Sequence, residues 1–271
     1  MARREEEGLL TERFERRDLG GTSLWARRDL MPAALAAGLA GADGWEPRLD
    51  RSSGGRGPTG LLELGTSGPR ARLKRLRRGG LAGPIWRDRF LGRSRILSNL
   101  TGPLEARRRG IPTPEPLLLL AIPGPPGLWR GWLATEDLPD AVPLERWLGT
   151  PEEPAIVREA MRIVRRMHDA GIEHRDLNLG NLLVRPSSGG HDVVILDLDD
   201  ARIHAGALGF AARRRALCRL ERSTAKRTGR PSFDGWYVAY AADDLELAAR
   251  LASGRVIDRM WIAVHRLTWK G

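Results

Sequence analysis

The chain has almost no cysteine and no long apolar run. Its single cysteine, Cys218, excludes an intramolecular disulfide and is typical of a reducing compartment. Apolar stretches such as residues 117–122 are far too short to span a bilayer. The first residues turn from basic to acidic with no apolar stretch behind them, so we expect no signal peptide. The remainder, with 41% hydrophobic residues, has the composition of an ordinary globular protein.

Negative charge is also scarce. The chain has 45 Lys and Arg against 34 Asp and Glu, a formal net charge of +11 at pH 7. Such an excess favours a polyanionic partner, which could be nucleic acid, an anionic membrane surface or a phosphorylated substrate. Any one basic cluster, taken alone, is an ordinary solvated surface. The clusters are Arg27–Arg28, Lys74–Arg78, Arg107–Arg109 and Arg213–Arg215.

One short stretch carries most of the chemical information. It contains His174, Arg175 and Asp176, with Asn181 five positions after that aspartate and Asp197 at the end of a later apolar run. This order is typical of a kinase catalytic loop followed by a metal-binding turn. Asp176 can orient an attacking hydroxyl, and the other two supply hard oxygen ligands for Mg²⁺ with the phosphates of ATP.

The residues around this motif predict a β-hairpin. Two apolar runs, at residues 182–184 and 193–196, flank a Ser/Gly turn at residues 187–190. Because a hairpin returns the chain on itself, Asn181 and Asp197 are expected close together. The alternative is an ordinary hairpin with solvated acids at its ends, since a motif stays a hypothesis until its structural context is known.

The rest of the pattern predicts an α+β protein with a β-rich N-terminal lobe and a short helical C-terminal lobe. The clearest helix, at residues 154–170, leads directly into the motif. We expect an N-terminal extension at residues 1–48, a nucleotide-binding N-lobe at 49–136 and a catalytic C-lobe at 137–271.

Individual elements can be predicted within these lobes. Strands are expected at residues 61–64, 71–76, 117–122 and 128–134, and short helices and turns at 1–45, including a helix at 32–40. Gly102 and Pro103 should interrupt any single helix within residues 79–109. Two tail helices, at 206–227 and 243–252, should flank a separating segment at 231–240.

Two candidate contacts to a nucleotide lie in the N-lobe. The glycine-rich loop that contains Gly55 and Gly57 precedes a strand, and backbone N–H groups of such loops can face phosphates. The connector at residues 135–138 reads as a hinge between the lobes, and Glu136 in it is a further candidate for nucleotide binding. Alone, each signal is weak, and each gains weight from its order relative to Asp176.

The short tail indicates what the acceptor is not. Few residues follow Asp199, and no Ala-Pro-Glu anchor appears after the metal turn. A small molecule or a sugar lipid is therefore favoured over a protein acceptor. No nucleic-acid-binding motif is present and the nine tryptophans are scattered, so we expect no nucleic acid partner.

Four stretches in this order resemble the lipopolysaccharide kinase family, in particular the kinases of 3-deoxy-D-manno-octulosonic acid (Kdo). They are Gly55–Gly57, Leu73–Leu81, Gly110–Pro114, and Asp176–Asn181 together with Asp197–Asp199. The resemblance implies a bilobal, protein-kinase-like fold and ATP-dependent phosphorylation of a Kdo hydroxyl in the lipopolysaccharide inner core. It also implies Kdo-lipid A as a partner, at the cytoplasmic face of the inner membrane, where the basic surface would bind anionic lipid peripherally.

The resemblance also assigns roles to single residues. Lys74 would hold the α- and β-phosphates of ATP, Asp176 would be the catalytic base, and Asn181 and Asp197 would bind Mg²⁺. The family's glutamate that pairs with the strand lysine should fall near residue 99, where this chain has Asn99. Glu105 is the nearest acid and requires a register shift.

This departure keeps other functions open. The chain could phosphorylate heptose or another small molecule on the same fold. It could instead be a pseudokinase that binds nucleotide without turnover, or a basic protein that binds nucleic acid with a steep salt dependence.

Overall fold

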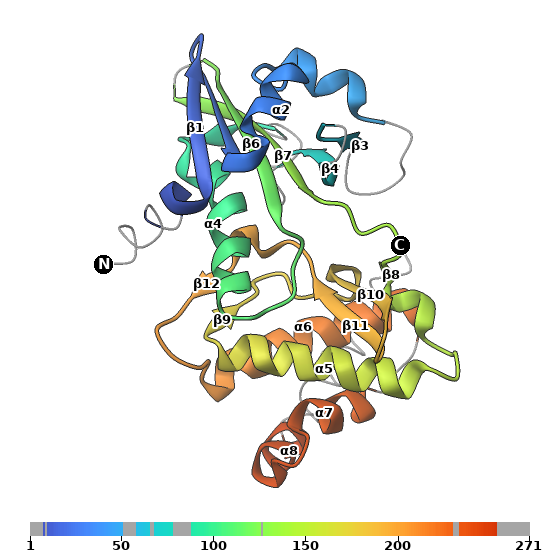
Figure 1. Cartoon of the computed structure of the whole chain (residues 1–271). Helices are drawn as coiled ribbons and strands as arrows, with labels where there is room; N and C mark the ends of the chain where they lie inside the picture. Colours follow the sequence, from blue (N-terminus) through green and yellow to red (C-terminus); the bar gives the residue numbers. More distant parts are fainter. Residues whose placement is uncertain are drawn as a thin grey trace. The chain divides into compact units, whose positions relative to one another are not determined.

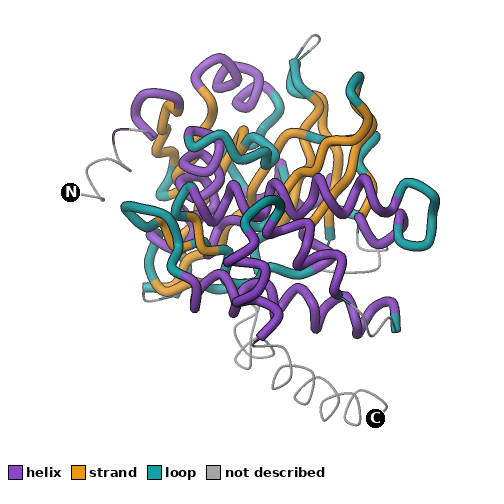
Figure 2. The backbone as a smooth tube through the Cα atoms, turned by 90° about the horizontal axis from the view of Figure 1, so that it is seen from below, coloured by secondary structure: helices purple, strands orange, loops and turns teal. Residues whose placement is uncertain are grey.

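The computed structural model describes residues 8, 10–50, 58–65, 68–77, 88–125, 127–229 and 233–253. The chain divides into two compact units (Figure 1). Unit 1 comprises residues 1–105 and 114–139, and unit 2 comprises residues 106–113 and 140–271. Figure 2 traces the backbone with helices in purple, strands in orange and loops in teal, and the residues outside the described ranges in grey.

Unit 1 is built on a seven-stranded antiparallel sheet. Its main path runs β1-β2-β6-β7-β4-β3, and β5 pairs with β7. The strands expected at 61–64, 71–76, 117–122 and 128–134 correspond to β3, β4, β6 and β7. The strands are β1 (Phe14–Leu19), β2 (Thr22–Arg27), β3 (Thr59–Glu63), β4 (Arg70–Arg75), β5 (Phe90–Leu91), β6 (Pro116–Pro123) and β7 (Leu128–Glu136).

The first 45 residues were expected to form only short helices and turns. They also supply the strands β1 and β2. A two-residue turn joins these strands, with Leu19 paired to Thr22. Gly20 and Gly21 occupy the turn at φ 55° and 86°, where residues with a side chain are strained. Since β2 also pairs with β6, unit 1 does not begin at residue 49 but includes this hairpin.

The helix expected at residues 32–40 is shorter than predicted. The helix α2 (Met31–Ala36) ends before Gly38, whose φ of 72° breaks the helical path two residues after the helix. Short 3₁₀ turns occur throughout both units. They are η1 (Arg28–Leu30), η2 (Ala42–Gly44), η3 (Glu46–Arg48), η4 (Leu144–Trp147), η5 (Leu179–Asn181) and η6 (Leu198–Asp200).

The helix α4 (Ser94–Arg108) runs straight through Pro103, so the expected interruption was wrong. A proline inside a helix costs about 3 kcal/mol, because it removes one hydrogen bond and crowds the preceding turn. Against this cost, Ile96, Leu100 and Leu104 are buried in one cluster with residues of the sheet. Each such side chain contributes roughly 1.5–3 kcal/mol, so tertiary packing outweighs the local penalty.

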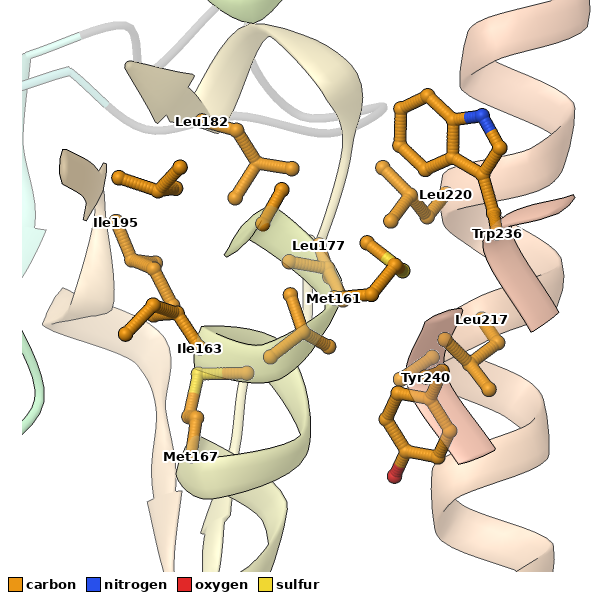
Figure 3. Packing of buried hydrophobic residues seen from close by; sticks show 14 of the residues in the cluster. Met161, Ile163, Met167, Leu177, Leu182, Ile195, Leu217, Leu220, Trp236 and Tyr240 are labelled. Carbon is orange, nitrogen blue, oxygen red and sulfur yellow. The ribbon is translucent and has the colours of Figure 1, made fainter. Parts of the chain in front are cut away.

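Unit 2 is centred on α5 (Glu153–Asp169), which confirms the helix expected at residues 154–170. Its apolar face packs into a core that also contains the β10–β11 hairpin and the tail helices (Figure 3). The strands of unit 2 are β8 (Val142–Pro143), β9 (Ile172–Glu173), β10 (Leu182–Ser187), β11 (Gly190–Ile195) and β12 (Arg202–Ile203). In Figure 1, α5 runs below the hairpin.

The tail forms three described helices where two were expected. They are α6 (Phe210–Thr228), α7 (Asp234–Ala241) and α8 (Leu245–Ser253). Helix α7 lies in the segment expected to separate the other two. Its Trp236 and Tyr240 face the same core as Leu217 and Leu220 of α6 (Figure 3), so α7 completes the core of unit 2. None of the helices among the described residues has the length and apolar character needed to cross a membrane.

Candidate functional site

The loop that carries Asp176 is anchored by alternating leucines. It follows α5 and the short strand β9, and Leu177 and Leu179 are fully buried in the core of unit 2. Asp176 is exposed, and Asn178 is half-buried. Apolar side chains directed inward therefore hold the backbone while the polar side chains between them remain accessible.

His174 ties this loop to the end of β11. Its Nε2 lies 3.0 Å from the carbonyl oxygen of Leu196, and its Nδ1 lies 3.2 Å from the backbone nitrogen of Asp176. Since a carbonyl only accepts and a backbone N–H only donates, Nε2 carries the proton and Nδ1 accepts. Burial lowers the pKa of His174, which favours this neutral form. These contacts agree with the interpretation of His174 as a brace.

Two asparagine amides hold Asp176 in place. Asn178 donates from Nδ2 to the backbone oxygen of Asp176 at 2.9 Å and to its carboxylate Oδ2 at 3.1 Å. Asn181 donates from Nδ2 to the same backbone oxygen at 3.0 Å. The Oδ1 of Asn178 accepts from the backbone of Gly180 at 3.0 Å and so caps η5. The Asp176 carboxylate is thereby oriented by a side chain two residues away.

The hairpin brings together the backbones of the two predicted metal ligands. Leu182 pairs with Ile195, and the backbone N–H of Leu196 donates to the carbonyl of Asn181 at 2.8 Å. Asp197 follows at once, in the left-handed conformation with φ 57° and ψ 50°. A residue other than glycine pays about 1–2 kcal/mol to adopt it. The hairpin itself, with its turn at residues 187–190, matches the prediction.

The donor set at this end of the hairpin fits Mg²⁺. Asn181 and Asp197 offer an amide and a carboxylate, and Mg²⁺ is usually bound by one or two such oxygens together with substrate phosphates. Within the described part of the chain, no group of three or more His, Cys, Asp or Glu side chains could hold a metal ion.

Helix α6 flanks the loop on its other side. The hydroxyl of Ser223 accepts a hydrogen bond from the backbone N–H of Leu179 at 3.1 Å. Arg219, one turn earlier, lies with Nη2 3.4 Å from the carbonyl of His174. The motif alone did not predict these two contacts, because the residues lie more than 40 positions downstream.

In unit 1, Lys74 lies in β4 on the sheet face that α4 covers. It pairs with Leu133 of β7, and paired residues of neighbouring strands point to the same face. Leu133 is buried in a cluster with Ile96 and Leu100 of α4. The predicted lysine is therefore on a strand, opposite a helix, as the resemblance implied.

The two candidate partners for Lys74, Asn99 and Glu105, lie at different positions around α4. The amide of Asn99 is buried and donates to the carbonyls of Arg95 and Ile96 in its own helix, at 3.3 and 3.1 Å. Glu105 lies about 180° around the helix from Ile96, since successive residues turn by about 100°. The buried Ile96, Leu100 and Leu104 occupy the side of α4 that packs on the sheet.

The remaining nucleotide candidates lie at two other places in unit 1. Gly55 and Gly57 fall outside the described residues, and the ends of their loop are joined by a hydrogen bond from Asp50 to Thr59 of 2.9 Å. Glu136 ends β7, and its backbone N–H donates to the carbonyl of Glu115 at 2.8 Å.

The residue after Glu136 is a structural anchor that the sequence did not reveal. The side chain of Asp137 is fully buried and lies 2.8 Å from Nη2 of Arg72 and 2.9 Å from Nε of Arg70. Its backbone N–H also donates to the carbonyl of Arg70 at 2.9 Å. Alternating arginines on a strand are visible in the sequence, but their shared carboxylate lies 65 residues beyond Arg72.

Comparisons with known proteins place these features in context. A family model described as the lipopolysaccharide kinase (Kdo/WaaP) family matches residues 51–237. A 3-deoxy-D-manno-octulosonic acid kinase of Xanthomonas campestris pv. campestris is 31% identical over 214 residues, which cover 77% of this chain and 82% of that protein. The kinase of the same name from Actinobacillus succinogenes is 31% identical over 195 residues, covering 68% and 78% of the two chains.

A solved structure supports the fold. The chain is similar to WaaP in a complex with acyl carrier protein, with a TM-score of 0.51 and 20% sequence identity. The match covers 86% of this chain and 93% of that one. It confirms the predicted α+β, bilobal, protein-kinase-like fold, with a sheet-rich unit followed by a helical one.

Proposed function

Because the chain belongs to the lipopolysaccharide kinase (Kdo/WaaP) family, we propose that it transfers the γ-phosphoryl group of ATP to a hydroxyl of a Kdo sugar. The acceptor would be Kdo-lipid A or a related lipopolysaccharide core. One observation carries the proposal most directly. Asp176 is held at the exposed side of a loop that the end of the β10–β11 hairpin braces through His174 and Asn181.

In the proposed reaction, the acceptor hydroxyl donates a hydrogen bond to the carboxylate of Asp176. The hydroxyl oxygen forms a bond to the γ-phosphorus while the bond to the β–γ bridging oxygen breaks, and the hydroxyl proton passes to Asp176. Asn178 supports this role, because its amide fixes one carboxylate oxygen at 3.1 Å. Preorganised carboxylates lose little orientation on reaching the transition state.

Asn181 and Asp197 would hold the metal ion that accompanies ATP. Mg²⁺, when bound, offsets the charge that develops on the phosphates. The unusual backbone of Asp197 is consistent with this role, since strained residues collect at ligand sites. Lys74 would bind the α- and β-phosphates, and Gly55, Gly57 and Glu136 remain proposed contacts to the nucleotide.

The acceptor also bears on where the protein acts. We place it at the cytoplasmic face of the inner membrane, bound peripherally, because the formal charge of +11 suits anionic head groups. Binding of this kind weakens as salt screens the charges. Sedimentation with phosphatidylglycerol vesicles at low and high salt tests this placement, and binding that does not change with salt would contradict it.

The central test is phosphate transfer to purified Kdo-lipid A by the wild type and by Asp176→Asn. We expect the variant to lose roughly a hundredfold to ten-thousandfold in kcat and to keep its affinity for Mg-ATP. Asp192→Asn is the matched control, since Asp192 is a half-exposed acid of the same hairpin, paired with Arg185. It should keep full activity.

A second candidate function follows from one observation in unit 1. The amide of Asn99 donates its hydrogen bonds to carbonyls of its own helix, which is consistent with a pseudokinase that binds nucleotide without turnover. A wild-type protein that binds Mg-ATP but phosphorylates no core sugar would favour this function. Transfer to a heptose acceptor, but not to Kdo, would retain the kinase and change its substrate.

A further inference from the structure

Four cations form a stripe along α6. Arg215, Arg219, Arg222 and Lys226 follow one another at intervals of four, three and four residues. At about 100° per residue these positions fall within an arc of about 60° on one side of the helix. The opposite side of α6 is buried in the core of unit 2, through residues that include Leu217, Leu220 and Thr224.

The cations of the stripe make no close ion pair with acids of the described residues. Other arginines of α6 make close ion pairs, Arg213 with Asp169 at 2.6 Å and Arg227 with Glu145 at 2.6 Å. Among the described residues, none of the four stripe cations has an ion pair within 4.0 Å. Like charges three or four residues apart destabilise a helix, so this pattern opposes the helix unless an anion binds.

The middle of the stripe touches the loop that carries Asp176. Arg219 reaches the carbonyl of His174, and the neighbouring Ser223 bonds the backbone of Leu179. Burial lowers the pKa of Arg219, the charges of Arg215 and Arg222 lower it further, and the charges of Glu173 and Asp176 oppose this change. Its Nε is buried without a hydrogen-bond partner in the described structure.

We propose that this stripe binds the anionic groups of the acceptor, a carboxylate or a phosphate, while Asp176 receives its hydroxyl. The inference rests on the proposed function and adds which surface selects the acceptor. A sugar acid carries a carboxylate near its hydroxyls, and guanidinium groups bind carboxylate and phosphate through paired hydrogen bonds. Position favours the acceptor over bulk lipid, because the stripe adjoins the catalytic loop.

The test uses the exposed members of the stripe, which have no described contact with the loop. The double variant Arg215→Gln/Arg222→Gln should raise the KM for Kdo-lipid A in neutral detergent micelles about tenfold. Its kcat and its KM for ATP should stay within about twofold, since binding alone is lost. The single variants Arg222→Gln and Arg158→Gln control for net charge, since each removes one positive charge. Arg158 is an exposed residue of α5 without a described ion pair.

Each other outcome has a defined meaning. An unchanged KM for Kdo-lipid A in the folded double variant overturns the stripe and leaves the kinase function intact. A raised KM for ATP would assign the stripe to nucleotide, and lost binding to phosphatidylglycerol vesicles at unchanged KM would assign it to the membrane. Both results overturn the proposal.

Failure of the proposed function can be recognised separately. If the wild type transfers no phosphate to Kdo-lipid A, equilibrium binding of that lipid without ATP still tests whether the stripe binds it. Weaker binding by Arg222→Gln than by Arg158→Gln, which removes the same charge, would support it. Equal binding would overturn it.

Discussion

The loop of Asp176 and the connector after β7 are held by opposite means. In unit 2, mainly neutral groups fix the loop, namely the imidazole of His174, the amides of Asn178 and Asn181 and the hydroxyl of Ser223, beside one longer contact from Arg219. In unit 1, the connector is fixed by the buried carboxylate of Asp137 between two arginines.

This difference sets which conditions disturb each region. Neutral hydrogen bonds respond little to salt, whereas ion pairs at half-exposed arginines are screened. Acid is expected to disturb the two regions in the opposite order, because histidines take up protons in mild acid. All five histidines of the chain, at positions 168, 174, 191, 204 and 265, belong to unit 2. Mild acid should therefore destabilise unit 2 before unit 1.

The largest expected effect is a loss of unit 2 stability in mild acid. His168 is fully buried against Tyr240, and burial lowers its pKa from 6.5 to about 3. Below pH 6.5 the unfolded chain takes up a proton that the folded chain refuses. Stability is therefore complete above pH 6.5 and falls by roughly 1.4 kcal/mol per pH unit towards pH 3. Urea unfolding at pH 7 and pH 4 measures the change.

A pair of substitutions isolates this histidine. His168→Gln removes one titrating group and should reduce the dependence on pH between 6.5 and 4. The slope that remains includes His174, whose pKa burial also lowers. His204→Gln is the comparison variant, because it removes a histidine whose side chain is 44% exposed. Equal slopes in all three proteins would show that other groups cause the loss.

The next effect concerns catalysis through His174. His174→Ala removes the brace between the backbone of Asp176 and that of Leu196, so the loop loses its fixed position. We expect kcat to fall roughly a hundredfold, the usual cost of misplacing a reacting group, with the KM for ATP unchanged. Steady-state kinetics test this, and a kcat within about twofold of wild type would show that the leucine anchors suffice.

A smaller effect is expected at the connector. Asp137→Ala leaves the guanidinium groups of Arg70 and Arg72 without their shared carboxylate. Both arginines are about half exposed, so water compensates in part, and we expect a loss of about 2 kcal/mol in unfolding free energy. Asp18→Ala is the control, because Asp18 lies 2.8 Å from Arg16 but is 57% exposed.

Chemical denaturation should rank these two variants clearly. Asp137→Ala should be the less stable, although both lose an aspartate bonded to arginine, because burial decides the worth of such a pair. Equal stability would mean that the connector is not anchored through Asp137.

The smallest effect is expected at Ser223. Ser223→Ala removes one acceptor, that of the Leu179 N–H, and should cost about 1 kcal/mol with a slight fall in kcat. Thr228→Ala on the same helix removes a hydroxyl that donates to the carbonyl of Thr224 at 2.8 Å. Thermal melts compare the two, and a larger loss in Thr228→Ala would contradict the role of Ser223.

The sequence predicted the elements whose pattern and packing agree. The amphipathic α5 and the β10–β11 hairpin, with Asn181 and Asp197 at one end, appeared as expected. Helix α7 was missed because it is apolar on nearly every side and shows no helical periodicity. The β1–β2 hairpin was missed although Gly20 and Gly21 were a usable turn signal.

The site was predictable only where its residues are close in the sequence. Asp176, Asn178 and Asn181 contact one another within six residues. The contacts of Ser223 and Arg219 with the loop, and the ion pair of Asp137 with Arg72, join residues 44 or more positions apart. Such contacts depend on how the elements pack, which no local pattern encodes. Helix α4 also depends on packing, because the burial of its apolar side chains outweighs the tendency of Pro103 to interrupt a helix.

The pairing of Leu182 with Ile195 has a consequence for how related chains are recognised. The hairpin, not the number of residues between them, brings Asn181 and the residue before Asp197 together. Its turn, at the far end of both strands, is free to grow by pairs of residues while the two ligands remain neighbours. A search pattern that demands one fixed interval between the asparagine and the aspartate will therefore miss chains whose site is intact.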